Sequence, residues 1–109
     1  MSKSVVFDIE NLYCKYKNKD FAALRIDSLK IHKGEITFFI GTSGSGKSTI
    51  LESMGLMNNT LDYQKNSVLD FFTKDGKVDF FDLWKKSDSD ISIFRRDYFN
   101  FIFQSENLF

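Results

Sequence analysis

Residues 41–49, with the sequence GTSGSGKST, bring three glycines, a lysine and several hydroxyl side chains together. Gly41, Gly44 and Gly46 let the backbone turn through positive φ and approach a polyanion closely. The inward-facing N–H groups of such a loop form a concave anion site, which the positive end of a following helix reinforces. Lys47 adds a full positive charge aimed at the β- and γ-phosphates. These residue types therefore predict a loop that binds a polyphosphate.

The hydroxyl of Ser48 adds metal chemistry to the same stretch. Mg²⁺ is a hard cation that takes oxygen ligands and retains waters and substrate phosphate oxygens, and Ser48 is placed to be one ligand. The whole stretch fits the Walker A pattern G-x-x-x-x-G-K-[ST]. The predicted nucleotide-binding residues are Gly41, Ser43, Gly44, Ser45, Gly46, Lys47, Ser48 and Thr49. The alternative is that a segment rich in glycine and serine is only a flexible loop.

A strand and a helix are predicted on either side of the loop. Residues 36–40 form a continuous apolar run that ends directly at Gly41, as expected for a buried strand. From Lys47 to Met57, the apolar residues have the spacing of one helical face packed on a sheet. These residues are Ile50, Leu51, Met54 and Met57. The order strand, loop, helix is the context that the Walker A mechanism requires, and it weighs against the flexible loop.

Further strands are predicted upstream of this unit. Residues 4–10 alternate between apolar and polar side chains, the period of a half-buried strand. Residues 11–20 are polar, and a second strand is predicted over residues 23–31. The apolar residues of this second strand change face midway, which predicts a β-bulge or a bend around residues 27–28. Residues 32–35 are predicted to turn the chain into the strand before the phosphate loop.

A β-hairpin is predicted downstream of the helix. Residues 68–72 and 77–81 are strand-like and flank Lys74-Asp75-Gly76. Because Asp-Gly suits primed turns, the two strands are predicted to pair antiparallel across such a turn.

A short helix and a last strand are predicted after the hairpin. Residues 88–90 offer several N-cap candidates, and cations at Arg95 and Arg96 suit the C-terminal end of a helix. Apart from this effect on the helix, we interpret Arg95 and Arg96 as charges exposed to solvent. Residues 98–103 are predicted to return to a strand that ends directly before Gln104.

The amino-acid composition excludes several classes of protein. The chain has 109 residues, with 15 acidic and 15 basic side chains, so no net field draws it to nucleic acid, and no nucleic-acid partner is expected. Cys14 is alone, which excludes an intramolecular disulfide and favours an inert thiol in the cytoplasm. No apolar run is long enough to cross a bilayer, so a membrane role would come through partner subunits. We interpret His32 as a solvated turn residue and the thirteen phenylalanines as core or interface.

The order of these features resembles the nucleotide-binding subunits of ABC transporters. Residues 29–36, LKIHKGEI, are similar to the family's lead-in to Walker A, and residues 95–105, RRDYFNFIFQS, are similar to the segment that leads into its Q-loop. The sequence of this Q-loop segment is most similar to that of the branch of lipoprotein-releasing and macrolide-export ATPases. The resemblance implies an α/β fold, in which an incomplete P-loop NTPase core of the ABC ATPase type carries an N-terminal antiparallel β subdomain.

The resemblance also implies roles outside the phosphate loop. Tyr16 falls where the family keeps an aromatic ring that stacks on adenine, with neighbouring Tyr13 as its rival. Gln104 falls on the Q-loop glutamine, whose amide orients water or completes a metal shell. The implied cofactors are ATP and Mg²⁺, the implied catalytic residues are Lys47 and Gln104, and the implied Mg²⁺ ligands are Ser48 and Gln104. The alternatives are a surface tyrosine at Tyr16 and an ordinary strand-end residue at Gln104.

The resemblance covers only the N-terminal portion of such a subunit. Residues 1–109 are expected to run from Walker A to the Q-loop, without the helical subdomain, the signature loop, Walker B or the switch histidine. Hydrolysis needs a Walker B aspartate to hold Mg²⁺, so we expect the chain alone to bind nucleotide weakly and not to turn it over.

The implied parent protein couples ATP hydrolysis to transmembrane transport. Its implied partners are membrane-spanning subunits and a second ATP-binding subunit, and its implied place is the cytoplasmic face of the cell membrane. Two other classes stay open: a different P-loop enzyme, such as a small-molecule kinase, and a non-catalytic nucleotide-binding module.

Overall fold

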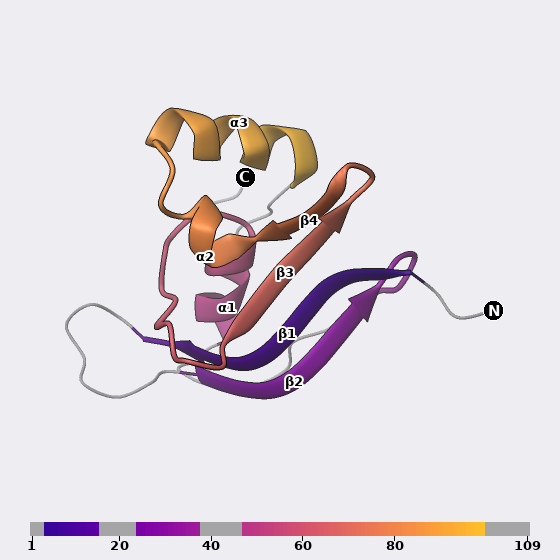
Figure 1. Cartoon of the computed structure of the whole chain (residues 1–109), viewed down its shortest axis with the longest axis vertical. Coiled ribbons are helices and arrows are strands. Elements are labelled where there is room, and N and C mark those ends of the chain that lie inside the picture. The colour runs from indigo at the N-terminus through magenta and orange to yellow at the C-terminus, as the bar shows by residue number, and fades with distance from the viewer. Residues whose placement is uncertain (1–3, 16–23, 38–46, 100–109) are drawn as a thin grey trace, which may run out of the picture.

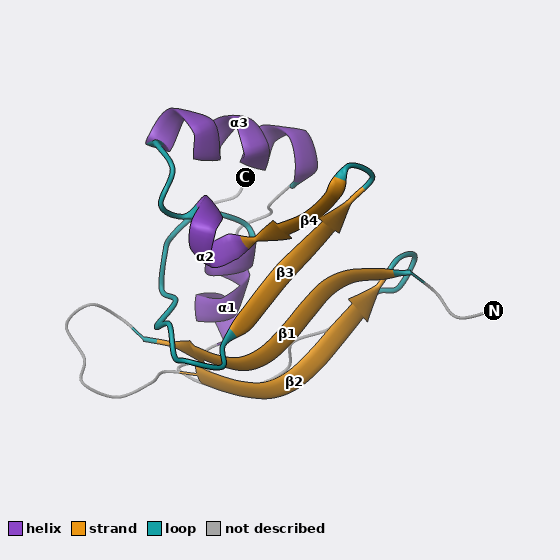
Figure 2. Cartoon of the chain, in the orientation of Figure 1, coloured by secondary structure: helices purple, strands orange, loops and turns teal. Residues whose placement is uncertain are grey.

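A computed structural model describes residues 4–15, 24–37 and 47–99 of the chain (Figure 1). In these ranges the strands are β1 (Val5–Cys14), β2 (Leu24–His32), β3 (Val68–Thr73) and β4 (Gly76–Asp79). The helices are α1 (Lys47–Met54), α2 (Phe80–Leu83) and α3 (Asp88–Tyr98) (Figure 2).

The four strands form one sheet in the order β2-β1-β3-β4, and each neighbouring pair is antiparallel. Figure 1 shows the strands side by side, with α2 and α3 following β4. The predicted antiparallel β subdomain is therefore confirmed, and the later hairpin is part of it. The predicted strand over residues 36–40 is not seen where the structure describes it: Ile36 and Thr37 lie in no strand, and Ile36 is exposed. Residues 38–40 lie outside the described ranges, so the parallel core of a P-loop fold is not among the described strands.

β1 continues past its predicted end at residue 10, through Cys14. The apolar residues change face midway along β1 and β2, as the pattern of β2 predicted. However, the register is the same on both sides of the change, with Ile9 opposite Leu29 and Leu12 opposite Ile26. Of the two predicted alternatives at residues 27–28, the bulge is therefore wrong; the register shift of this strand pair lies between Val5 and Phe7. The bend agrees with Asn11, which faces the same point from β1 and has a φ of 47°, a left-handed conformation that asparagine tolerates.

The turn after β2 is confirmed. Gly34 has a φ of 81°, and the Glu35 backbone N–H donates to the His32 carbonyl at 3.2 Å. The Glu35 carboxylate accepts a hydrogen bond from the His32 backbone N–H at 2.9 Å and lies 3.1 Å from His32 Nδ1. His32 thus belongs to a closed turn and is half-buried rather than fully solvated.

The hairpin of β3 and β4 is confirmed, but its turn is not of the predicted primed type. Thr73 pairs with Gly76, so Lys74 and Asp75 form the loop. Neither loop residue has a positive φ, whereas Gly76 has a φ of 127°. Glycine is the residue that adopts this conformation without steric cost.

β4 ends two residues before the predicted end of the strand at residue 81, because Asp79 caps a helix. Asp79 Oδ1 accepts a hydrogen bond from the Phe81 backbone N–H at 2.9 Å. This side-chain contact satisfies one of the unpaired N–H groups at the start of α2. Phe80 and Phe81 are consequently helical.

α3 is confirmed as a helix, with corrected ends. Ser87 Oγ accepts from the Asp90 backbone N–H at 3.1 Å, so Ser87 is the N-cap rather than a residue of 88–90. The helix ends at Tyr98, which therefore does not begin the predicted strand. The remainder of that strand, residues 100–103, lies outside the described residues.

α1 ends at Met54, before the predicted end at Met57. Ile50 and Met54 are buried as predicted, but Leu51 and Met57 are exposed. Met57 follows the end of the helix, and Leu51 lies within the helix but outside its buried face.

The C-terminal end of α1 is closed by a Schellman motif. The Met57 N–H donates to the Glu52 carbonyl at 2.8 Å and the Leu56 N–H to the Ser53 carbonyl at 3.3 Å. Leu56 has a φ of 60°, which is unfavourable for a leucine, but its side chain is buried in the core. Arg95 Nη1 donates to the Leu56 carbonyl at 2.7 Å and so ties α3 to this end of α1.

Arg95 is therefore not the solvated charge that the sequence suggested, and Arg95→Ala tests this contact. We expect the substitution to lower the free energy of unfolding by about 1–3 kcal/mol, because it removes a charge-assisted hydrogen bond and leaves a partly buried carbonyl unpaired. Denaturant unfolding followed by circular dichroism measures the change.

Arg96→Ala is the matched control. The Arg96 side chain is exposed and contacts only the neighbouring Asp97, at 3.3 Å, among the described ion pairs. Exposed pairs contribute little, so we expect a change within about 0.5 kcal/mol. Equal losses in the two variants would contradict a specific role for Arg95.

Candidate functional site

Three of the predicted site residues lie in a described element. Lys47, Ser48 and Thr49 are the first three residues of α1. The first turn of a helix carries unpaired N–H groups and the positive end of the helix dipole. The start of α1 at Lys47 therefore brings this end to the C-terminal edge of the Walker A sequence. The other predicted residues lie outside the described ranges: Tyr16, Gly41, Ser43, Gly44, Ser45, Gly46 and Gln104.

A network of buried hydroxyl groups lies on the core side of α1. Thr49, Ser53 and Thr60 are 1%, 0% and 3% exposed. Thr60 Oγ1 donates to the Thr49 carbonyl at 3.1 Å and lies 2.6 Å from Ser53 Oγ. Ser53 Oγ in turn accepts from the Thr60 backbone N–H at 2.9 Å. These bonds hold α1 from its core side.

Sequence reasoning missed Thr60 and Ser53. Thr60 lies in a polar segment that has the composition of an ordinary turn. Ser53 lies within a helix that was predicted from its apolar residues alone. The available signal was a pair of hydroxyl residues, Thr49 and Ser53, spaced four apart on the buried side of the helix with Ile50. Buried hydroxyls need partners, so this pair pointed to a polar contact from elsewhere in the chain.

Tyr13, the rival for the adenine-stacking role, lies within β1 opposite Arg25 of β2. The Arg25 guanidinium carbon is 5.4 Å from the centroid of the Tyr13 ring, a cation–π contact. The Tyr13 carbonyl accepts from the Asp62 N–H at 2.8 Å. Tyr13 is thus engaged by its own sheet, whereas Tyr16 lies outside the described residues.

Cys14 is fully buried at the end of β1. Burial raises the pKa of its thiol from the ordinary value of 9.0 to about 11, and the nearby Asp62 carboxylate contributes to the rise against a hydrogen bond with Thr60. Since the thiolate is the nucleophile, this cysteine is inert at neutral pH, as predicted.

The raised pKa of Cys14 predicts a loss of stability in alkali. The unfolded chain releases the thiol proton above pH 9, whereas the folded chain retains it to about pH 11. Stability from this group is therefore full below pH 9 and falls as the pH rises toward 11, by up to about 2–3 kcal/mol. The measurement is the difference in free energy of unfolding between the wild type and Cys14→Ala across this range. A difference that does not change with pH would contradict the prediction.

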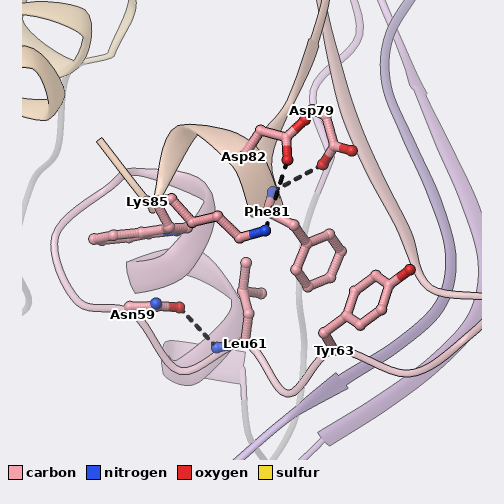
Figure 3. Close-up of a pocket in the computed structure, with 8 residues that line it drawn as sticks. Asn59, Leu61, Tyr63, Asp79, Phe81, Asp82 and Lys85 are labelled. Atoms are coloured by element: carbon pink, nitrogen blue, oxygen red, sulfur yellow. Dashed lines mark hydrogen bonds and ion pairs between the residues drawn. The ribbon is translucent and has the colours of Figure 1, made fainter.

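A separate pocket of about 470 Å³ lies beside α2 (Figure 3). The described residues that line it are Asn59, Leu61, Tyr63, Asp79, Phe81, Asp82, Trp84 and Lys85. None of them is a predicted nucleotide-site residue, and several of their polar groups pair with one another, as the dashed lines in Figure 3 show. The pocket is therefore not the predicted phosphate site.

The described residues contain neither a metal-binding cluster nor a membrane-spanning helix. No group of three or more His, Cys, Asp or Glu side chains in those ranges could hold a metal ion. Among the described helices, none has the length and apolar character needed to cross a membrane.

Comparison with known proteins gives the family. The model of the ABC transporter family matches residues 24–109. The lipoprotein-releasing system ATP-binding protein LolD of Ehrlichia chaffeensis is 36% identical over 106 residues, 96% of this chain and 41% of LolD. The macrolide export ATP-binding/permease protein MacB of Acinetobacter baylyi is 29% identical over 99% of this chain and 15% of MacB. The phosphate import ATP-binding protein PstB of Mycoplasma mobile is 44% identical over 62 residues, 57% of this chain and 22% of PstB.

No solved structure matches the chain. The chain spans 41% of the length of LolD and smaller shares of MacB and PstB. The similarity to LolD and MacB agrees with the branch that the Q-loop segment, residues 95–105, indicated. With a family match that covers most of the sequence, the chain belongs to the ABC transporter family and carries part of its ATP-binding domain.

Proposed function

We propose that the chain binds ATP and Mg²⁺ as part of an ABC transporter ATPase subunit, which couples ATP hydrolysis to transmembrane transport. The observation that carries the proposal is that Lys47, Ser48 and Thr49 lie in the helix α1, as the last residues of a Walker A sequence must. The relatives LolD, MacB and PstB are each named as ATP-binding components of transport systems.

The donor set of the loop fits a magnesium-bound triphosphate. Residues 41–49 contain an ammonium group, five hydroxyls and three glycines, and no carboxylate that would repel a phosphate. Lys47 neutralises the terminal phosphates, Ser48 ligates the metal, and Gly41, Gly44 and Gly46 admit the polyanion to the backbone N–H groups. When bound, Mg²⁺ neutralises charge on the phosphate oxygens.

The outer residues complete the proposed site. Tyr16 offers the face of its ring to adenine, and the Gln104 amide orients water and completes the metal shell. The proposed partners are membrane-spanning subunits and a second ATP-binding subunit, which would hold the protein at the cytoplasmic side of the membrane. Since residues 1–109 contain no Walker B carboxylate, this stretch is proposed to bind nucleotide without turning it over.

Titration of the 109-residue chain with a fluorescent ATP analogue, with and without Mg²⁺, tests the proposal. We expect saturable binding that Mg²⁺ strengthens and that unlabelled ATP reverses. A chain that is folded by circular dichroism but shows no saturable binding would refute ATP binding. Mg²⁺-dependent ATP turnover by the chain alone would refute the claim that it does not hydrolyse ATP.

A further inference from the structure

Thr60 connects two segments that lie far apart in the sequence. Its hydroxyl donates to the carbonyl of Thr49 in the first turn of α1, at 3.1 Å. Its own carbonyl accepts from the backbone N–H of Lys15, the residue after β1, at 2.8 Å. An isolated bridge between Cys14 and Leu61 extends the contact with the end of β1. One buried residue therefore joins the start of α1 to the end of β1.

Ser53 is the second hydroxyl residue in contact with Thr60. Thr60 Oγ1, Ser53 Oγ, the Thr49 carbonyl and the Asn58 carbonyl make three close contacts, at 2.6, 3.1 and 3.0 Å. Two hydroxyls carry only two protons, so only two of these contacts are hydrogen bonds at one time. Thr60 Oγ1 donates to the Thr49 carbonyl and Ser53 Oγ donates to the Asn58 carbonyl. Ser53 Oγ also accepts from the Thr60 backbone N–H at 2.9 Å, so Ser53 holds the backbone of Thr60 against α1.

The two ends of this connection adjoin the two halves of the proposed ATP site. Thr49 follows Ser48, the proposed Mg²⁺ ligand, and Lys15 precedes Tyr16, the proposed adenine platform. We propose that Thr60 is a positioning residue, held in place by Ser53, that sets the phosphate-binding start of α1 against the adenine-binding end of β1. The inference rests on the proposed function. Because ATP must engage both halves at once, a shift between them weakens ATP binding more than the binding of a ligand that uses one half.

Thr60→Val tests this role, since valine keeps the shape of threonine and removes its hydroxyl. The probes are ATP and inorganic tripolyphosphate, each with Mg²⁺ and each competing with a fluorescent ATP analogue. We expect the substitution to raise the Kd of ATP about 5-fold or more and that of tripolyphosphate less than about 2-fold. Thr60→Ser keeps the hydroxyl and should bind both ligands within about 2-fold of the wild type.

Ser53→Ala provides a second, independent variant. It leaves the Thr60 side chain intact but removes the acceptor of the Thr60 backbone N–H, so it should show the same selective loss of ATP affinity. Circular dichroism establishes which variants are folded, and Ser53→Ala decides the outcome if Thr60→Val does not fold. Equal weakening of both ligands in a folded variant, or no weakening of either, would overturn the positioning role.

The outcomes separate this inference from the proposed function. A wild-type chain that binds neither ligand refutes the proposed function and removes the basis of the inference. A wild-type chain that binds ATP, together with folded variants that keep the wild-type ratio of the two Kd values, refutes only the inference.

Discussion

Replacing Phe80 by alanine is expected to abolish the cooperative fold of the chain. Phe80 is 0% exposed, and its ring centroid lies 5.6 Å from that of Phe7 and 6.1 Å from those of Phe71 and Phe99. Removing a buried phenylalanine costs about 3–5 kcal/mol, because transfer energy is lost and a cavity remains. A small domain has a total stability of only about 5–15 kcal/mol, so this loss is a large part of the whole.

Thermal unfolding measures the effect of Phe80→Ala. Far-ultraviolet circular dichroism reports the sheet and helices, and Trp84, the one tryptophan of the sequence, reports the core by its fluorescence. We expect the variant to show no cooperative transition, or one shifted far below that of the wild type.

Phe72→Ala is the matched control for Phe80→Ala. Phe72 lies on β3 beside Phe71, but its side chain is 38% exposed. The same deletion of a ring should cost less than about 1.5 kcal/mol there, because less apolar surface leaves the core. The packing argument would fail if the two variants lost equal stability or if Phe80→Ala unfolded at the wild-type temperature.

Lys47→Ala is expected to weaken binding of the ATP analogue about 10- to 100-fold in the presence of Mg²⁺. A charge-assisted hydrogen bond contributes about 1.5–3 kcal/mol, and the terminal phosphates carry most of the charge of the nucleotide. Lys47 lies at the start of α1, where the helix dipole acts on the same anion. The alanine variant should keep the wild-type melting temperature, because alanine suits a helix.

Lys33→Ala controls for the loss of one positive charge. Lys33 is exposed in the turn after β2, and its described contact is the backbone hydrogen bond to the Ser4 carbonyl at 2.8 Å. Its removal should change the affinity for the analogue less than about 2-fold, since exposed charges are screened. Should Lys47→Ala bind as tightly as Lys33→Ala, the bound nucleotide would not be held by the proposed phosphate loop.

Local patterns were sufficient where local forces decide the structure. Apolar patterns predicted β1 and β2, the Asp75-Gly76 turn signal predicted the hairpin, and the apolar spacing after Lys47 predicted the helix α1. The ends of elements were less predictable, because capping depends on single contacts. Asp79 ends β4 by accepting a hydrogen bond from Phe81, and Ser87 rather than its acidic neighbours caps α3.

Contacts between distant segments were beyond the reach of sequence patterns. The sequence predicted Arg95 to be a surface charge, yet its side chain reaches from α3 to the Leu56 carbonyl just after α1. The face change of the second strand predicted either a bulge or a bend, and only the pairing with β1, which keeps its register past Asn11, decided against the bulge. No periodicity reports which carbonyl a side chain will reach.

The amino-acid sequence by itself determined the chemistry proposed for this protein, because a phosphate loop needs particular residue types in a particular order. It also determined the family, which the comparisons confirmed. Only the tertiary structure decided that Thr60 contacts Thr49 and Ser53 on the core side of α1 and joins this helix to the end of β1. The physical reason is that a buried hydroxyl takes its role from the partners that folding brings within about 3 Å, and no periodicity of the sequence identifies those partners.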